Sequence, residues 1–252
     1  MSSWYSIEPG KFLVNNHDSN KKLYRIIPFD SLLYMLNEEE NILVKTSKWD
    51  DVYENFFLKE NFHINGVRKD FTPVINRFFG QCWSSRSSSD ALWRIYSSDH
   101  KSVRIRTTIE KVDSIVQGTV DNNLVFLLGK VNYYSRKKIE DDLKNATPLK
   151  LDQVFDYMLK SLFVKRDSFR HESEYRLICM CDPRTSYFHD DIIKLKINPL
   201  EFIEQICFDP RADDAYVLRC KRVLTKAFSF PSSRIVKSTL YDFSHCTLDV
   251  VQ

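Results

Sequence analysis

Short apolar segments typical of β-strands recur along the whole chain, and helical segments interrupt them at irregular intervals. Uniformly apolar or alternating runs predict strands, whereas apolar residues three or four positions apart predict helices. Strands and helices do not alternate strictly, so a wholly parallel βαβ sheet is not expected. The pattern predicts an α+β fold in which helices flank a mixed or antiparallel central sheet. The predicted strands are 21–27, 41–47, 77–85, 102–109, 123–134, 174–181, 192–197, 204–210 and 234–240, and the predicted helices are 29–40, 88–99, 151–166 and 213–228.

The composition supports one large domain. Hydrophobic residues make up 43 % of the 252 residues, and 18 Phe, 12 Tyr and 4 Trp supply the apolar volume of a sizeable core. No low-complexity linker or internal repeat divides the chain. We therefore expect a single domain over residues 1–252, with its core across roughly residues 22–240.

The residue types that are scarce or scattered argue against several classes of protein. With only 5 glycines, the chain contains neither G-x-G-x-x-G nor G-x-x-x-x-G-K, which argues against nucleotide binding through those loops. The 6 cysteines include no C-x-x-C pair, so we expect free thiols in a reducing cytoplasm and no structural metal. Neither a signal-peptide pattern nor an apolar run of about 20 residues is present, and we expect a cytoplasmic protein without membrane contact. The net charge of +3 permits a polyanionic partner without requiring one.

One arginine lies within an apolar strand. Arg25 stands between Tyr24 and Ile26 in the predicted strand 21–27. From the residue alone, a surface position or a structural ion pair is the better interpretation. If the side chain points inward it needs an anion, and its planar guanidinium suits a phosphate or a carboxylate.

Polar residues end the strand predicted at 77–85. Ser84 and Ser85 follow directly after Trp83. Serines at the end of a core strand can donate a hydrogen bond to a ligand in the cleft where strands terminate. They can equally end the strand or cap the helix that follows, and this structural interpretation is favoured for either serine alone.

Two aromatic residues share one face of the helix predicted at 88–99. Trp93 and Tyr96 lie three positions apart. Aromatic residues at helical spacing are more often part of a core than a platform for a ligand ring. One of the two could still stack on a base or on a nicotinamide ring.

Two glutamates precede an apolar strand. Glu172 and Glu174 are two apart, so in an extended segment their side chains face the same side. Like charges on one face repel unless something lies between them, and their pairing can raise one pKa and produce an acid–base candidate. The alternative is a solvated strand edge with Arg170 or Arg176 as partner.

The order of these motifs resembles that of a large bacterial family of unknown function. The segments that carry the resemblance lie in residues 22–210 and run in the order LYRII, KWDDVYENF, CWSSRSSSDALWRIYSSDHKSVRI, GKVNYY and FVKRDSFRHESEYRLI. Members of that family are found among phage-defence and toxin systems. The resemblance therefore implies a toxin or effector of bacterial anti-phage defence, held in check by an antitoxin protein.

A second resemblance is to the R-S-E class of ADP-ribosyltransferases, which use NAD as a substrate. It implies an ADP-ribosyltransferase-like fold and, as catalytic residues, Glu174, Glu172 and Arg25. Glu174 would stabilise the cationic sugar formed as nicotinamide leaves, and Glu172 would position or deprotonate the acceptor. The implied NAD-binding residues are Tyr24, Arg25, Ser84, Trp93 and Tyr96.

The acceptor implied by this resemblance is a macromolecule. The basic segments KSVRIR, SRKK and VKRDSFRH suit a nucleic acid, with RNA favoured, although such runs are usually only solvated surface. A protein acceptor stays open. Water could also take the acceptor's place, which would make the reaction NAD hydrolysis.

Two other functions compete with the transferase. The first is a metal-dependent nuclease whose carboxylates are Asp50, Asp51, Glu54, Glu172 and Glu174. The second is a binding module without catalysis, in which Arg25 and Glu174 form a buried ion pair. An open pocket between these two residues would favour NAD, whereas a direct contact without a cleft would favour the binding module.

Overall fold

A computed structural model describes residues 13–14 and 18–243, apart from residues 52, 55, 61, 120, 122, 146–147, 149, 183, 186 and 190. Within this part of the chain, eleven strands form one sheet whose main path runs β1-β8-β11-β6-β2-β7-β14-β15. β3 pairs with β6 and β13, and β12 pairs with β13. The strands are β1 Leu13–Val14, β2 Lys22–Ile27, β3 Glu40–Lys45, β6 Phe78–Ser84, β7 Val103–Thr108, β8 Leu124–Lys130, β11 Glu174–Cys181, β12 Phe188–His189, β13 Ile192–Lys196, β14 Gln205–Phe208 and β15 Ile235–Lys237.

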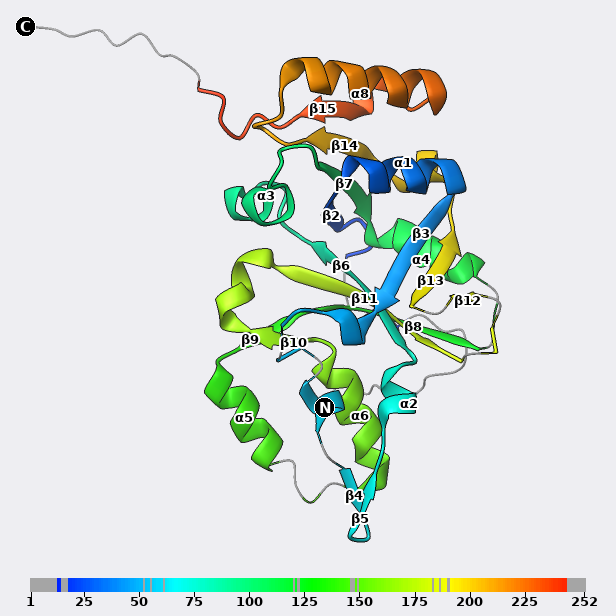
Figure 1. The fold of residues 1–252 in the computed structure, drawn as a ribbon, viewed down its shortest axis with the longest axis vertical. Coiled ribbons are helices and arrows are strands. Elements are labelled where there is room, and N and C mark those ends of the chain that lie inside the picture. The colour runs from blue at the N-terminus through cyan, green and yellow to red at the C-terminus, as the bar shows by residue number, and fades with distance from the viewer. Residues whose placement is uncertain are drawn as a thin grey trace, which may run out of the picture.

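Most neighbouring strands in this sheet are antiparallel, and the pairs β1–β8 and β14–β15 are parallel. This arrangement, with helices around the sheet, confirms the predicted α+β class with a mixed sheet (Figure 1). Each strand predicted from an apolar run corresponds to a strand of the structure, with ends shifted by a few residues.

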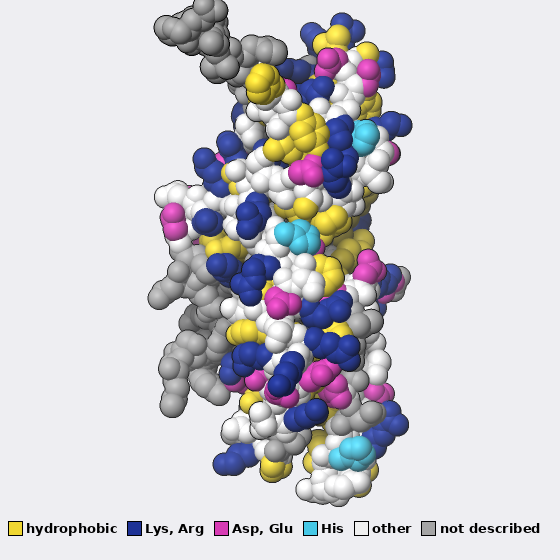
Figure 2. Space-filling view, turned by 90° about the vertical axis from the view of Figure 1, so that its left-hand side faces the viewer, with side chains coloured by type: hydrophobic (Ala, Val, Ile, Leu, Met, Phe, Trp, Pro, Cys, Tyr) yellow, Lys and Arg dark blue, Asp and Glu magenta, His cyan; other side chains and the backbone are white. Residues whose placement is uncertain are grey.

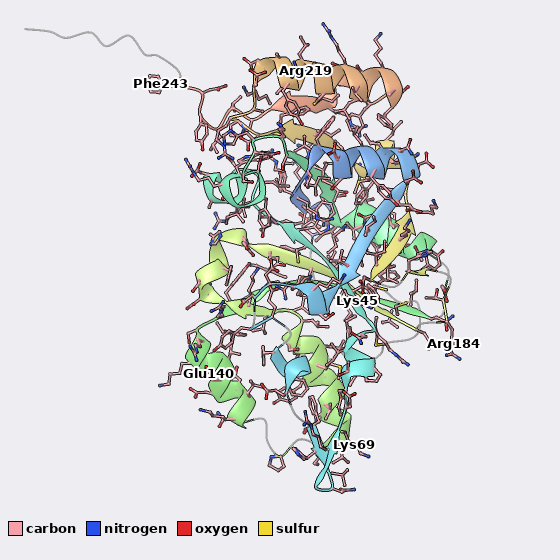
Figure 3. All side chains as sticks on the ribbon, viewed as in Figure 1. Lys45, Lys69, Glu140, Arg184, Arg219 and Phe243 are labelled. Carbon is pink, nitrogen blue, oxygen red and sulfur yellow. The ribbon has the colours of Figure 1, made fainter. Side chains whose placement is uncertain are left out.

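The helices lie around and beyond the sheet. In Figure 1, α8 lies beside β14 and β15 at one end of the molecule, whereas α5, α6 and the β4–β5 hairpin lie at the other. Figure 3 labels Arg219 at the first end and Lys69 at the second. No helix among the described residues is both long enough and apolar enough to cross a membrane. The helices are α1 Phe29–Glu38, α2 Thr72–Ile75, α3 Asp90–Tyr96, α4 Ile109–Gly118, α5 Arg136–Asn145, α6 Leu151–Ser161, α7 Pro199–Phe202 and α8 Asp214–Ala227, and the hairpin strands are β4 Phe62–Ile64 and β5 Val67–Lys69.

One predicted helix is too long at its C-terminal end. The sequence pattern extends it over 151–166, but α6 ends at Ser161 and the chain continues as a strand, β10 (Val164–Arg166). β10 pairs in parallel with β9 (Asn132–Tyr134), the last part of the strand predicted at 123–134. β10 pairs with a strand that is distant in the sequence. Such tertiary pairing overrides the local helical pattern of these residues.

The sheet opens between β2 and β6. β6 pairs with β11 over seven residues, but β2 pairs with β6 only through Tyr24 and Ser84. Over the rest of its length β2 follows β7, from Lys22 to Ile27. β2 and β6 therefore separate beyond this single pair, and the residues after Tyr24 on β2 and before Ser84 on β6 border an opening in the sheet.

Two apolar clusters pack on opposite faces of β6 and β11. Phe79 and Leu177 belong to the larger cluster, which α1, α4 and α8 cover. Phe78 and Ile178 belong to the smaller cluster, with α6. Neighbouring residues of a strand point to opposite faces, so both faces of this part of the sheet are buried.

Gly80 on β6 leaves room for an aromatic ring. A Cβ at this position would lie 2.5 Å from Trp49 Cζ2 and 3.1 Å from Ile178 Cδ1. We expect Gly80→Ala to lower the free energy of unfolding by about 1–3 kcal/mol, because the tightly packed ring must move. Urea unfolding measures this change.

The matched control for Gly80→Ala is Gly118→Ala, at the end of α4. A Cβ there meets no atom within 4 Å. Alanine also favours helical backbone, so we expect this variant to be as stable as the wild type or more stable, by up to about 1 kcal/mol. Equal losses in the two variants would show that the Trp49 contact is not the cause.

Candidate active site

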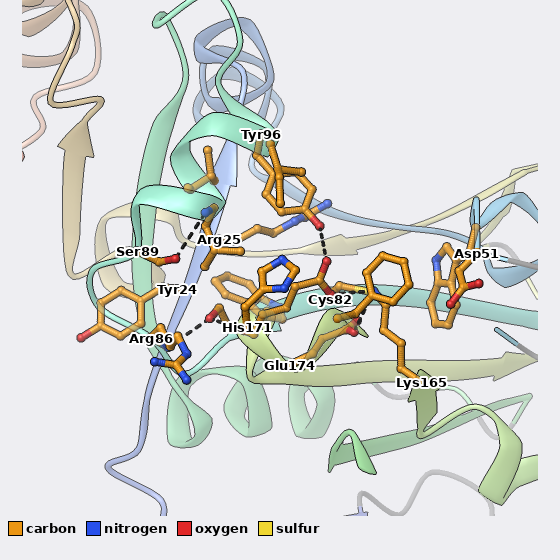
Figure 4. Close-up of a pocket in the computed structure, with 18 of the residues that line it drawn as sticks. Tyr24, Arg25, Asp51, Cys82, Arg86, Ser89, Tyr96, Lys165, His171 and Glu174 are labelled. Atoms are coloured by element: carbon orange, nitrogen blue, oxygen red, sulfur yellow. Dashed lines mark hydrogen bonds and ion pairs between the residues drawn. The ribbon is translucent and has the colours of Figure 1, made fainter. Parts of the chain in front are cut away.

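A pocket of about 800 Å³ opens where β2 and β6 separate. This volume falls within the range of about 300–1,000 Å³ that is usual for small-molecule sites. Side chains of α3, β10, β11, and the segments before and after them complete its wall (Figure 4). All the residues predicted to act on or bind NAD line this pocket, although their roles stay predictions: Tyr24, Arg25, Ser84, Trp93, Tyr96, Glu172 and Glu174.

The two glutamates converge through a turn. Glu172 is the last residue of a 3₁₀ helix, η3 (Asp167–Glu172), and Glu174 is the first residue of β11. Ser173 between them has left-handed backbone, with φ 45° and ψ 54°. The extended segment expected from the sequence is therefore wrong.

Ser84 and its neighbour fix this turn to the end of β6. Ser84 Oγ donates a hydrogen bond of 2.6 Å to the carbonyl oxygen of Glu172. The backbone N–H of Ser85 donates to the carbonyl oxygen of Ser173 at 3.0 Å. Ser84 Oγ also accepts a hydrogen bond from the backbone N–H of Arg86 at 3.0 Å. The Ser84 hydroxyl thus positions Glu172, and its proton is already engaged with the protein.

A buried lysine lies among three carboxylates. Lys165 Nζ is 2.6 Å from Glu172 Oε2, 3.0 Å from Glu54 Oε1 and 3.5 Å from Glu174 Oε2. The side chain is buried, as are Glu172 and Glu174 with exposed fractions of 7 % and 3 %. The glutamate pair is therefore not a solvated strand edge, although Arg176, one of the two partners proposed for such an edge, does contact Glu174. A cation of the protein itself separates the like charges.

Arg176 binds the carboxylate of Glu174. Its Nε and Nη2 donate to Glu174 Oε1 and Oε2 at 2.9 and 3.1 Å, and Nη2 also donates to Glu54 Oε1 at 2.7 Å. Nη1 donates to the carbonyl oxygen of Leu162 at 2.6 Å, and the guanidinium lies 4.4 Å from the centre of the Trp49 ring. Arg176 is completely buried, so these partners make the hydrogen bonds that water makes with an exposed guanidinium.

Burial and neighbouring charges act in opposite directions on the two carboxyls that Arg176 contacts. Burial raises the pKa of Glu174, but Arg176 and then Lys165 outweigh it and hold that pKa below its ordinary value. For Glu54, burial is the stronger influence and the pKa is raised despite Arg176 and Lys165. Of these two carboxyl groups, Glu174 therefore has the lower pKa and stays ionised to the lower pH.

Lys165→Met should leave three buried carboxylates without the cation between them. Lys165 lowers the pKa values of Glu54 and Glu174, so its loss should raise both in the folded state, which then binds protons more tightly and gains stability relative to wild type as the pH falls. We expect the variant to be least stable relative to wild type at pH 7–8, and the difference to narrow towards pH 5. Urea unfolding across this range measures the effect.

Lys194→Met is the matched control for Lys165→Met. Lys194 Nζ lies 3.0 Å from Glu40 Oε2, but its side chain is partly exposed and Lys196 contacts the same carboxylate. We expect little change in stability at any pH, because water and Lys196 still solvate Glu40. A pH-independent difference between Lys165→Met and wild type would contradict the charge argument.

Arg25 lies in the pocket without a counter-charge. Among the described residues it has no hydrogen-bond or ion-pair partner, and burial lowers the pKa of its guanidinium. The Arg25–Glu174 ion pair of the binding-module interpretation is not formed, because Arg176 contacts Glu174 in its place. A guanidinium without a counter-charge in a pocket can bind an anionic group.

Two further nitrogen atoms of the pocket wall lack partners. Arg104 Nε and His171 Nε2 are buried, and no described residue accepts or donates a hydrogen bond to either. Buried polar atoms are rarely left unpaired in proteins. Together with Arg25, they indicate a pocket whose hydrogen bonds are completed by something other than the described chain.

The three aromatic residues differ in what they can offer a ligand. Trp93 is only 1 % exposed, so its ring is mainly part of the core. Tyr24 is also buried, and the Arg104 guanidinium lies 5.1 Å from the centre of its ring. Tyr96 is 48 % exposed, and its hydroxyl donates to Glu172 Oε1 at 3.2 Å.

Cys82 also lines the pocket, next to Glu174. Burial, followed by the charge of Glu174, raises the pKa of its thiol well above the ordinary value. A thiol in this environment stays protonated and is a poor nucleophile. Covalent catalysis by Cys82 is therefore disfavoured.

The nuclease interpretation requires carboxylates that are free to bind metal ions. Asp51 instead accepts a hydrogen bond of 2.7 Å from Arg166 Nη2, and Glu54 and Glu174 share Arg176. No group of three or more His, Cys, Asp or Glu side chains in the described part of the chain is arranged to hold a metal ion. Cationic side chains occupy the space between the carboxylates that metal ions would take.

Comparisons with known proteins agree with the family resemblance. A family described as "Protein of unknown function (DUF2971)" matches residues 92–177, which confirms the resemblance over that segment. No curated protein matches the chain. Among solved structures, Thermus sp. 2.9 DarT in complex with ADP-ribosylated ssDNA shares 10 % identity, with 90 % of this chain and 98 % of that chain covered and a TM-score of 0.41. The same protein in complex with NAD⁺ shares 10 % identity, with 88 % and 98 % covered and a TM-score of 0.40.

Proposed function

We propose that this protein is an ADP-ribosyltransferase that consumes NAD and modifies a macromolecule. One observation carries the proposal. The same pocket contains an arginine without a counter-charge, Arg25, and a buried glutamate pair, Glu172 and Glu174. An anionic group and a developing cation can therefore both be accommodated in it.

The charges of NAD match this division of the pocket. Its diphosphate is anionic and suits Arg25, whose planar fork can bind two phosphate oxygens. Its nicotinamide ring is cationic and suits the wall where three carboxylates outnumber Lys165 and Arg176. We therefore place the nicotinamide ribose beside Glu174 and the diphosphate beside Arg25.

The chemistry required at this position is the stabilisation of a cationic sugar. When the bond between the ribose C1′ and nicotinamide breaks, its electron pair leaves with nicotinamide and positive charge develops on the ribose. Glu174 is held ionised and immobile by Arg176, so its carboxylate is preorganised for that charge. Glu172 lies beside it, on the side of Tyr96, where an acceptor would enter.

The surface around the pocket favours a nucleic-acid acceptor. Figure 2 shows the face that carries α3 and α5, and Lys and Arg side chains gather over its middle. Arg86 lines the pocket and is exposed, and Arg94 and Arg170 are exposed beside pocket-lining residues. Exposed cations next to an exposed aromatic ring, Tyr96, are typical of sites that bind single-stranded nucleic acid.

The test is incubation of the purified protein with radiolabelled NAD and, in separate tubes, RNA, DNA or a cell lysate. We expect nicotinamide release and label on RNA or DNA. Label on protein alone would replace the nucleic-acid acceptor with a protein. Intact NAD in every tube would contradict the transferase, and the nuclease would then be tested with magnesium or manganese.

The proposed role in the cell is that of a toxin restrained by an antitoxin protein, and it rests on the family resemblance. An active transferase should slow the growth of a bacterial host when its expression is induced. Normal growth with fully active protein in the cell would contradict this role.

A further inference from the structure

Helix α3 is fixed at both ends, so its side chains have defined positions. Ser89 caps the N-terminus by accepting a hydrogen bond from the Leu92 N–H at 3.3 Å. At the C-terminus, Arg211 Nη2 donates to the carbonyl oxygens of Trp93 and Ser97, each at 3.0 Å. The buried Asp209 holds this arginine at 2.7 Å.

Tyr96, at the end of this helix, connects the outside of the pocket with the buried glutamates (Figure 4). Its exposed fraction of 48 % contrasts with 7 % for Glu172, the residue that its hydroxyl contacts. Ile95, which also lines the pocket, is exposed as well. A macromolecule that reaches Glu172 from solvent therefore meets Tyr96 on its way.

The hydrogen bonds of this residue determine what its hydroxyl can still do. A phenol has one proton, and Tyr96 donates it to Glu172 Oε1. Glu172 Oε2 accepts from Lys165 at 2.6 Å, which fixes the carboxylate with Oε1 towards Tyr96. Burial and then Glu172 raise the pKa of Tyr96, so the phenol keeps its proton. The free lone pairs of its oxygen can only accept a hydrogen bond from an incoming N–H or O–H.

We propose that Tyr96 is the acceptor-side catalytic residue of the transferase, and this inference rests on the proposed function. The nucleophilic N–H or O–H of a single-stranded nucleic acid donates to the Tyr96 oxygen, while its base lies against the Tyr96 and Ile95 side chains. The bond from ribose C1′ to nicotinamide breaks, and its electron pair leaves with nicotinamide. A bond forms between C1′ and the acceptor atom. The acceptor's proton passes to the Tyr96 oxygen as the phenolic proton passes to Glu172, which later releases it to solvent.

Water and a macromolecule should depend differently on this residue. Water is small enough to reach the ribose without a positioned hydrogen bond, whereas a macromolecular acceptor must be oriented to attack. Loss of the hydroxyl should therefore reduce transfer more than NAD hydrolysis. The resemblance to R-S-E ADP-ribosyltransferases implies instead that Tyr96 binds NAD, and that role predicts an equal loss of both reactions.

The experiment measures label transfer and nicotinamide release in the same tubes, with homopolymeric single-stranded RNA and DNA oligonucleotides as acceptors. The proteins are wild type, Tyr96→Phe and Tyr34→Phe. Tyr34 is the matched control because its hydroxyl also donates to a glutamate, Glu40, at 3.0 Å, and Lys194 contacts the same carboxylate. It does not line the pocket.

We expect Tyr96→Phe to lower the ratio of transferred label to released nicotinamide by about 10–100-fold, as loss of a hydrogen bond with a charged partner would. Tyr34→Phe should leave the ratio unchanged. Partial unfolding cannot imitate this result, because it lowers both quantities together.

Each other outcome overturns the inference. An equal fall in transfer and nicotinamide release would place Tyr96 on the NAD side, and no change would show that it is not involved. Nicotinamide release by wild type without label on either oligonucleotide would remove the nucleic-acid acceptor while leaving NAD consumption intact. Absence of nicotinamide release by wild type would instead be the failure of the proposed function, and the Tyr96 role would fail with it.

Discussion

Glu174→Gln is expected to lower the rate of nicotinamide release by about 10²–10³-fold or more, the usual effect of removing a preorganised group that stabilises charge in a transition state. Glutamine has almost the same shape but no charge, so the developing cation on the ribose loses its nearest fixed anion. Release of nicotinamide from NAD, followed by chromatography, measures the rate.

The same variant should be less stable, but folded. Arg176 donates two hydrogen bonds to Glu174, and an amide can accept through its oxygen alone. Glu54 and the carbonyl oxygen of Leu162 still contact the buried guanidinium. We expect a loss of about 1–3 kcal/mol in the free energy of unfolding, and a folded protein by circular dichroism.

Glu54→Gln separates the loss of charge from the loss of catalysis. Glu54 contacts Lys165 and Arg176 as Glu174 does, and it is equally buried, so its replacement removes the same charge from the same cluster. We expect a comparable change in stability and a much smaller fall in the rate of nicotinamide release than in Glu174→Gln. If the two variants released nicotinamide at the same rate, Glu174 would have no special role in the reaction.

The polar residues of the site could be found in the sequence because they interrupt apolar segments. Arg25 within a strand and the glutamate pair before another strand are conspicuous for this reason. Lys165 was missed, because the apolar spacing of residues 151–166 continues the helix of α6 past its real end at Ser161. Only the pairing of β10 with β9 directs this lysine towards the carboxylates.

The fold could be predicted as far as local pattern determines it. Apolar runs identify the strands, but the strand order and the opening between β2 and β6 depend on contacts between distant segments. Helix α5 escaped prediction because most of its residues are polar and Ile139 is its only residue described as buried. Ion pairs between residues one turn apart stabilise it, such as the pair of Arg136 with Glu140. Figure 3 labels Glu140 on this helix.

The two arginines Arg176, which is buried, and Arg25, which is half-buried in the pocket, should respond to substitution in opposite ways. Arg176 has partners on every side, whereas Arg25 has none among the described residues. A charge that folding removes in part from water, without giving it a partner, destabilises the protein that carries it. Proteins retain such residues where a ligand provides the missing partner, at a cost in stability.

Arg25→Met is therefore expected to raise the free energy of unfolding while weakening NAD binding. Methionine keeps much of the length and apolar surface of the side chain without the desolvated charge. Loss of a charge-assisted hydrogen bond to phosphate should raise the Kd for NAD by about 10–100-fold. Urea unfolding without NAD and calorimetric titration with NAD measure the two changes.

Arg176→Met provides the contrast to Arg25→Met. It leaves Glu54 and Glu174 buried with only Lys165 as a nearby cation, and we expect a loss of about 3–5 kcal/mol in the free energy of unfolding. If Arg25→Met were destabilised to the same degree, Arg25 would be a structural residue with partners of its own. Its charge would then be unavailable for the diphosphate, and the placement of NAD in this pocket would lose its main support.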